Sequence, residues 1–217
     1  SPTRGSCLTG RHPFRYGVYH ANVGKLKDEE YSLAELAKDH NYTTGHFGKW
    51  HLGTLTHEKG DGNRSGDTTV YAPPWQHGFD KCFSTESKVP TWDPMLTPPF
   101  GICYEGRKNP PGEPFGTYYW NENGEKVRTN LEGDDSRIIM DRAIPFIENA
   151  HQSNQPFLAV IWFHSPHLPV IAGPKYRELY QDNSVQEQHY YGSITAMDDQ
   201  VGRLRKALDG LGISNNT

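Results

Sequence analysis

Basic side chains that can exchange protons or hold an anion gather at three places in this sequence. Lys49 and His51 follow one short run of strand-forming residues, and His164 and His167 follow another. Arg4 lies close to the first residue, where a neighbouring proline suits the first turn of a helix. The amide groups and the dipole of a helix start favour an anion. These groups together describe a site for a tetrahedral oxyanion, and phosphate and sulfate both fit it.

The two runs that precede these side chains are predicted to be strands. Residues 43–47 are rich in strand formers, and residues 157–163 are continuously apolar, as expected of a strand covered on both faces. Ligands of open α/β sheets bind beyond the carboxyl ends of the strands. If the two strands are neighbours, the lysine and the histidines can converge on one crevice.

Three further segments predict helices. Ser32 and Glu35 form a capping box for a helix that runs to about residue 40. Residues 135–150 carry apolar side chains at helical spacing, although Pro145 is expected to kink that helix. The clearest helix carries an apolar stripe made of Tyr190, Ile194, Met197, Val201, Leu204, Leu208 and Leu211. This alternation of helices and strands predicts an α/β sheet with helical layers.

A long excursion at about residues 54–134 separates these elements. Nine of the sixteen prolines fall between Pro73 and Pro114, which excludes a long helix or a central strand there. A small hairpin is expected near residues 117–127, with its turn at Asn123 and Gly124. Five aromatic residues of the excursion either stack on sugar rings or pack in the protein: Trp75, Trp92, Tyr118, Tyr119 and Trp120.

The composition excludes some classes of partner. The net charge of −4 and the pI of about 6.2 leave no basic footprint, which argues against nucleic acid. The longest apolar run, residues 157–163, is too short to cross a bilayer. Three cysteines, Cys7, Cys82 and Cys103, leave an odd thiol and show no metal-binding spacing. We expect Cys7 to be a buried helix thiol.

Several stretches resemble one known family in the order in which that family has them. Residues 1–4, Ser-Pro-Thr-Arg, with Leu-Thr-Gly at 8–10, are similar to the tail of the first signature of the formylglycine-dependent sulfatases. Residues 48–53, Gly-Lys-Trp-His-Leu-Gly, look like the second signature. Residues 162–169 resemble the later segment whose histidine contacts the sulfate. Residues 76–80 and 190–211 also look like family stretches, so the resemblance spans nearly the whole chain.

The resemblance implies a fold and a domain organisation. It implies an α/β, alkaline-phosphatase-like sandwich in which a central, mostly parallel sheet lies between helical layers. The sandwich is expected to be incomplete at both ends. Residues 1–217 are then the central part of a single sulfatase catalytic domain.

The resemblance also implies a role for each matching side chain. The nucleophile is a hydrated formylglycine, derived from a cysteine expected immediately before Ser1, whose hydroxyl attacks sulfur and displaces the alcohol. Arg4 is expected to hold and polarise this diol, and His51 to bond it and act as a base in sulfate release. Lys49 is expected to neutralise a sulfate oxygen, and His167 to bind sulfate or protonate the leaving alcohol. Ser84 is a weaker candidate for a residue that faces the sulfate.

By the same resemblance, the enzyme requires one calcium ion, a cation that takes oxygen ligands. The family's ligands are expected before Ser1 and after Thr217, so no metal ligand is predicted within this chain. The pair Asp134 and Asp135 is expected to start a helix, and Asp198 and Asp199 to lie on a solvated helix face. The 217-residue chain by itself is therefore predicted to be inactive.

The implied function is hydrolysis of sulfate esters, on a small molecule or a glycan, with sulfated carbohydrates favoured. One alternative is a phosphonate or phosphate-ester hydrolase of the same superfamily. Another is a non-catalytic protein that binds sulfated glycans. The expected partners are the substrate and a formylglycine-generating maturation enzyme. An extracytoplasmic location (periplasmic, secreted or lysosomal) follows from what the family does.

Overall fold

A computed structural model describes residues 1–57, 60–61, 69–99 and 109–217, so Cys103 lies outside the described residues. The chain divides into two compact units that are interleaved in sequence. The first unit consists of Ser1–Ser87, Thr117–Val127 and Asn149–Trp162. The second consists of Lys88–Gly116, Arg128–Glu148 and Phe163–Thr217. The expectation of one catalytic domain over the whole chain stays a prediction.

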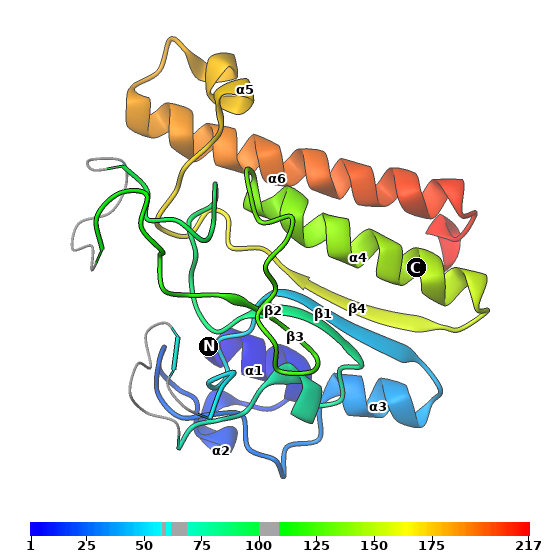
Figure 1. Ribbon diagram of the computed structural model, residues 1–217. Helices are drawn as coiled ribbons and strands as arrows, with labels where there is room; N and C mark the ends of the chain where they lie inside the picture. Colours follow the sequence, from blue (N-terminus) through cyan, green and yellow to red (C-terminus); the bar gives the residue numbers. More distant parts are fainter. Residues whose placement is uncertain (58–59, 62–68, 100–108) are drawn as a thin grey trace. The chain divides into compact units, whose positions relative to one another are not determined.

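The first unit is built on a four-stranded sheet with the order β3-β2-β1-β4 (Figure 1). Its strands are β1 (Thr43–Lys49), β2 (Lys81–Thr85), β3 (Tyr119–Asn121) and β4 (Phe157–Trp162). Strand β1 pairs in parallel with both β2 and β4, whereas β3 is antiparallel to β2. The prediction of an α/β fold with a mostly parallel sheet is confirmed, and β1 extends two residues beyond the predicted strand.

Strands β1 and β4 are neighbours, as the argument for a shared crevice required. Their register runs from Thr43 opposite Phe157 to Gly48 opposite Trp162. Parallel strands end at the same edge of a sheet. Lys49 and the segment after it therefore begin at the edge of the sheet where β4 also ends.

Three helices of the first unit precede β1. They are α1 (Pro2–Thr9), α2 (Pro13–Tyr16) and α3 (Leu33–Asp39), and α3 contacts both β1 and β4 (Figure 1). The predicted capping box is present, because Ser32 Oγ accepts a bond from the Glu35 amide at 3.1 Å. The Glu35 carboxylate in turn accepts a bond from the Ser32 amide at 2.7 Å. Helix α3 therefore begins where the sequence predicts.

The predicted hairpin is also present. The Asn121 amide donates to the Glu125 carbonyl at 3.0 Å, and the Val127 amide donates to the Tyr119 carbonyl at 2.9 Å. The turn contains Gly124, whose φ of 72° is in the left-handed region that favours glycine. Pairing of this hairpin with β2 was not predicted, because nothing local in the sequence specifies a partner for its first strand.

The second unit contains the long helices α4 (Asp135–Gln152, through Glu148 in this unit) and α6 (Val185–Gly210). The short helix α5 (Pro174–Arg177) packs on α6 through a small cluster of Ala172, Tyr176 and Ala196. Short 3₁₀ segments complete the elements: η1 (Pro74–Gln76) in the first unit, and η2 (Glu178–Tyr180) and η3 (Ser214–Asn216) in the second.

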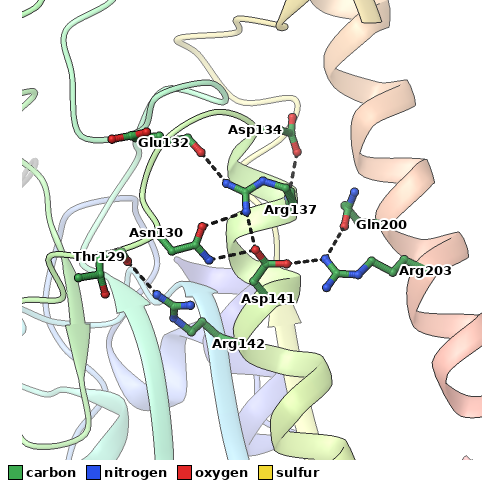
Figure 2. A network of polar contacts seen from close by, with 9 residues as sticks. All are labelled: Thr129, Asn130, Glu132, Asp134, Arg137, Asp141, Arg142, Gln200 and Arg203. Carbon is green, nitrogen blue, oxygen red and sulfur yellow. Dashed lines mark hydrogen bonds and ion pairs between the residues drawn. The ribbon is translucent and has the colours of Figure 1, made fainter. Parts of the chain in front are cut away.

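A polar network joins α4 to α6 in the second unit (Figure 2). Asp141 accepts bonds from Arg203 Nη1 at 2.5 Å and from Asn130 Nδ2 at 3.0 Å, and it also pairs with Arg137 on its own helix. The Arg137 side chain donates to the Glu132 carbonyl as well. The segment before α4 is thereby tied to both helices.

Three expectations about burial were wrong. They concern strand β4, the apolar stripe of α6 and the thiol of Cys7. Among the described strands, β4 lies at one of the two edges of the sheet and is half-buried along its length, because no described strand pairs with it on its outer side. The buried residues of α6 are small or polar: His189, Gly192, Ser193, Ala196 and Gln200. A Cβ at Gly192 would lie 2.8 Å from the Ala172 Cβ, so close packing against residues 172–176 selects this face, and the predicted apolar stripe stays partly exposed. Cys7 is exposed, whereas Cys82 is buried.

Candidate functional site

Arg4 connects the start of α1 to the end of β1. Its Nε donates to the Lys49 carbonyl at 3.1 Å, and its guanidinium carbon lies 5.2 Å from the centre of the Trp162 ring. Burial lowers the pKa of Arg4, yet a guanidinium stays protonated in proteins. A permanent positive charge is thus held beside the carboxyl ends of both β1 and β4.

The position of α1 depends on Tyr16, which the sequence reading missed. Tyr16 is fully buried, and its hydroxyl donates to the Pro2 carbonyl in the first turn of α1. A Cβ at Gly5 would lie 2.6 Å from the Tyr16 ring, so only glycine allows this approach. A tyrosine fourteen residues from Pro2 carries no local signal of this contact.

Lys49 is the last residue of β1 and is only 5% exposed. The segment that follows stays paired, because the Trp50 amide donates to the Thr85 carbonyl at 2.9 Å and the His51 amide donates to the Glu86 carbonyl at 3.1 Å. The Trp50 indole donates to the Ala72 carbonyl at 2.7 Å and is fully buried. An anion bound beside this buried ammonium would offset part of the cost of burying its charge.

His51 is also 5% exposed and adopts a φ of 60°, which is uncommon for a residue other than glycine. Its Nε2 lies 2.6 Å from Asn22 Oδ1. Because an amide oxygen only accepts, this bond places a proton on Nε2. The strained backbone and the fixed ring are typical of a functional position. Asn22 lies in a loop between helices, and its partnership with His51 has no sequence signal.

Ser84 lies inside the first unit and is fully buried. Its Oγ lies 2.7 Å from His46 Nδ1, and the His46 ring makes edge contacts with Trp50, Phe79 and Trp162. This environment supports a structural bond to His46. The expectation that Ser84 faces a sulfate gains no support from the geometry and stays a prediction.

A buried carboxyl pair borders the segment that contains His51. The Asp61 amide donates to Glu86 Oε2 at 2.9 Å, and Asp61 Oδ2 accepts bonds from the Trp120 indole at 2.8 Å and from the Tyr118 amide at 2.9 Å. Burial raises the pKa of Asp61 to about 6. These bonds hold residue 61 and the hairpin against the end of β2, and the sequence did not indicate them.

The excursion's aromatic residues divide between packing and partial exposure. Tyr119 and Trp120 are buried, and Tyr119 stacks on Phe83 with ring centres 3.9 Å apart. Trp75, Trp92 and Tyr118 are half-buried. Packing therefore accounts for Tyr119 and Trp120, and stacking on sugar rings stays a prediction for the other three.

His164 and His167 belong to the second unit and differ sharply in exposure. His164 is 2% exposed, and its Nδ1 lies 2.8 Å from Asp135 Oδ2, whose side chain is fully buried. His167 is exposed, and its Nδ1 lies 2.7 Å from the Leu168 carbonyl oxygen. Of the two histidines, His167 is exposed and His164 is buried.

The acidic pairs behave largely as expected. Asp135 is the first residue of α4, and Asp134 Oδ1 accepts a bond from the Arg137 amide at 2.9 Å. Asp198 and Asp199 are exposed on α6. Across the described ranges, no group of three or more histidine, cysteine, aspartate or glutamate side chains is arranged to hold a metal ion. Within the same ranges, no helix combines the length and the apolar character that a membrane span needs.

The sequence was compared with models of known protein families. A sequence model of the family named Sulfatase matches residues 1–217. The chain belongs to the sulfatase family.

Curated relatives of this sulfatase chain include enzymes named for glycan sulfates. It is 28% identical to an ulvan-active sulfatase of Formosa agariphila over 240 residues, which covers all of this chain and 39% of the relative. It is 31% identical to arylsulfatase G of Rattus norvegicus, covering 99% of this chain and 40% of the relative. N-acetylgalactosamine-6-sulfatase of the same species is 28% identical, with 39% covered. The sulfatase chain thus spans about two fifths of the length of these relatives.

Solved structures support the fold. The crystal structure of Ps i-CgsB matches with a TM-score of 0.73 and 22% identity, over 97% of this chain and 44% of that one. The phosphonate monoester hydrolase of Agrobacterium radiobacter matches with a TM-score of 0.57 and 18% identity, over all of this chain and 51% of that one. Both comparisons confirm the α/β architecture expected for a sulfatase.

Proposed function

We propose that the protein to which this chain belongs hydrolyses sulfate esters, with sulfated carbohydrates as substrates. The observation that carries the proposal is the bond from Arg4 Nε to the Lys49 carbonyl, which brings a helix start and two buried basic residues, Lys49 and His51, to one place. Membership of the sulfatase family supports sulfate as the anion. The printed names of the relatives, which include ulvan and N-acetylgalactosamine, support a carbohydrate carrier.

A formylglycine immediately before Ser1 fits the residues that are present. The charge agrees, because Arg4 lies in the first turn of α1 and a helix start favours an anion. When present, the formylglycine supplies the hydrated aldehyde that acts as nucleophile. Arg4 orients it, and His51, with its ring held by Asn22, takes up a proton during sulfate release. Lys49 neutralises charge that develops on the sulfate oxygens.

His167 is the proposed acid for the leaving alcohol. Its side chain is exposed, and its Nδ1 is bonded to the Leu168 carbonyl, so Nε2 is the nitrogen proposed to donate a proton to the leaving oxygen. An alcohol leaves poorly as an alkoxide, and a proton delivered to its oxygen lowers that barrier. Ser84 is retained only as a weak candidate for substrate binding, because His46 already engages it.

Calcium belongs to the proposal only through the family. The described residues contain no group of three or more histidine, cysteine, aspartate or glutamate side chains that could hold the ion. Its ligands are proposed to lie before Ser1 and after Thr217. From the family we also propose that a formylglycine-generating enzyme matures the protein and that the protein acts outside the cytoplasm.

A phosphonate or phosphate-ester hydrolase is the second candidate. A basic site at a helix start accepts any tetrahedral oxyanion, and a phosphonate monoester hydrolase shares the fold. A non-catalytic protein that binds sulfated glycans is the third candidate, because binding needs the same cations without a nucleophile.

The test uses the full-length protein, produced with a formylglycine-generating enzyme. Release of sulfate or phosphate from 4-nitrophenyl sulfate, 4-nitrophenyl phosphate and a phenyl phosphonate monoester is measured in parallel. We expect kcat/KM to be highest for the sulfate. A preference for either phosphorus ester supports the second candidate, and binding of sulfated glycan without turnover of any ester supports the third.

A further inference from the structure

His164, three residues before the proposed acid His167, forms a fully buried pair with Asp135 that the proposed mechanism does not use. His164 Nδ1 and Asp135 Oδ2 are 2.8 Å apart, and both side chains are 0% exposed. A buried ionisable pair contributes little net stability compared with apolar residues of the same size. Its presence therefore calls for a reason other than stability.

Asp135 is also anchored through its backbone. Its amide donates to the Thr91 carbonyl at 3.1 Å, at the first residue of α4. Thr91 is itself fixed, because its Oγ1 donates to the Ile171 carbonyl at 2.6 Å and accepts a bond from the Ile171 amide at 2.7 Å. The carboxylate that bonds His164 thus belongs to the first residue of α4, which is bonded to Thr91 and through it to Ile171.

The backbone of His164 is bonded to the turn that contains His167. The His164 carbonyl accepts a bond from the His167 amide at 2.7 Å. The ring of His167 is then oriented by the bond of Nδ1 to the Leu168 carbonyl. Because a carbonyl only accepts, Nδ1 carries a proton. As the proposed acid, His167 acts in its doubly protonated form, in which Nε2 donates its proton to the leaving oxygen and Nδ1 keeps its own.

We propose that His164 and Asp135 are positioning residues that hold the His167 turn in the geometry needed to protonate the leaving alcohol. His164 does not itself touch the substrate, because its side chain is fully buried. The inference rests on the proposed function, in which His167 is the acid. It adds two residues, which are twenty-nine positions apart in sequence, to the machinery.

A positioning role has a signature that a purely structural role lacks. Protonation matters most for a poor leaving group and little for 4-nitrophenolate. Loss of the acid or of its positioning therefore lowers kcat/KM more for a sugar sulfate than for 4-nitrophenyl sulfate. A general loss of folded protein lowers both rates by the same factor.

The experiment compares these two substrates in the full-length protein. We expect His167→Ala to lower kcat/KM on the sugar sulfate about 100-fold more than on the aryl sulfate, and His164→Ala about 10-fold more. The double variant is expected to be no worse than His167→Ala, because the effect of His164 passes through His167. His164→Asn keeps a donor near the position of Nδ1 and is expected to restore most of the ratio between the two substrates.

His189→Ala is the matched control. His189 is also 2% exposed in the second unit, and its Nδ1 accepts a bond from the Ala172 amide at 3.0 Å. Its loss is expected to lower both rates equally. If His164→Ala does not fold, Asp135→Asn and Asp135→Ala carry the same comparison, with the amide variant expected to keep the ratio and the alanine variant to lose it.

Two results separate the ways in which the inference can fail. If His164→Ala lowers both rates equally, or adds its full loss to that of His167→Ala, the positioning role is wrong while the proposed function stands. If His167→Ala shows no dependence on the leaving group, or the wild-type protein turns over no sulfate ester, the role of His167 is wrong and the inference fails with it.

Discussion

The end of β1 and the turn that follows β4 hold their basic side chains in different ways. After β1, backbone bonds and tight sterics do the holding: the amides of Trp50 and His51 pair with carbonyls at the end of β2, and Arg4 bonds the Lys49 carbonyl. After β4, the turn is held by the buried side chains of His164 and Asp135, which bond each other. The first region is held through its backbone, whereas the second is held through a buried pair of side chains.

The first prediction concerns the charge held by the first region. Lys49→Ala in the full-length protein is expected to lower kcat/KM for 4-nitrophenyl sulfate by about 1,000-fold, because one charge that stabilises the transition state is lost. Lys175→Ala is the matched control, since Lys175 is exposed on α5 and pairs with Asp199. A loss of less than ten-fold for Lys49→Ala, with a stable fold, would show that the proposed sulfate site lies elsewhere.

The second prediction concerns Asp134, the buried acid that precedes Asp135 in sequence. Burial raises the pKa of Asp134 from 3.8 to about 7. The folded protein therefore keeps a proton that the unfolded chain releases, and stability falls as the pH rises from about 4 to about 7. Asp134→Asn retains the acceptor for the Arg137 amide and removes this loss, with a gain of up to about 3 kcal/mol at pH 8.

Thermal melts of the full-length protein between pH 4 and pH 8 check this prediction. The difference in Tm between Asp134→Asn and wild type is expected to grow up to pH 7 and then to level off. Asp198→Asn, at an exposed position on α6, is the control and is expected to show a constant small difference. A difference for Asp134→Asn that is the same at pH 5 and pH 8 would contradict the assignment of a buried, protonated acid.

The third prediction tests whether sterics hold the first region. Gly5→Ala places a Cβ 2.6 Å from the buried Tyr16 ring, and we expect a loss of about 2 kcal/mol in the free energy of unfolding. Gly202→Ala is the control, because no atom lies within 4 Å of its added Cβ on α6. There, alanine is expected to stabilise the helix by roughly 0.5–1 kcal/mol. Urea unfolding measures both, and equal signs for the two variants would refute the steric account.

The fourth prediction concerns the contact that orients His51. Asn22→Ala removes the acceptor of His51 Nε2 and is expected to lower kcat about 10-fold, with a smaller change in KM. Asn154→Ala is the control, because Asn154 also has a positive φ and is exposed. Steady-state kinetics distinguish the two, and equal small losses in both variants would mean that Asn22 serves only the loop backbone.

What the sequence could predict was local, as two elements illustrate. The capping box of Ser32 and Glu35 sets the start of α3 through residues three apart, and the Asn-Gly turn sets the hairpin. The motif that contains Lys49 and His51 begins in the last two residues of β1, at the strand end where the sequence predicts a functional loop. Interactions confined to a few neighbouring residues leave a pattern that can be read directly.

What the sequence could not predict depends on contacts between distant residues. The bond of His51 to Asn22 and the pair of His164 and Asp135 each join side chains twenty-nine positions apart. The buried face of α6 was also misjudged, because close packing around Gly192 outweighs the period of the apolar stripe. Neither kind of contact leaves a local pattern, since the partner is chosen by the fold.

The most direct test of this contrast is the dependence of kcat/KM on the leaving group, measured with a series of sulfate esters on the full-length protein. Lys49→Ala is expected to lower every rate by a similar factor, because the charge on sulfate is the same in each ester. His167→Ala is expected to lose most activity on the poorest leaving groups. If the two variants show the same dependence on the leaving group, the division into a region that holds the anion and a region that delivers the proton is wrong.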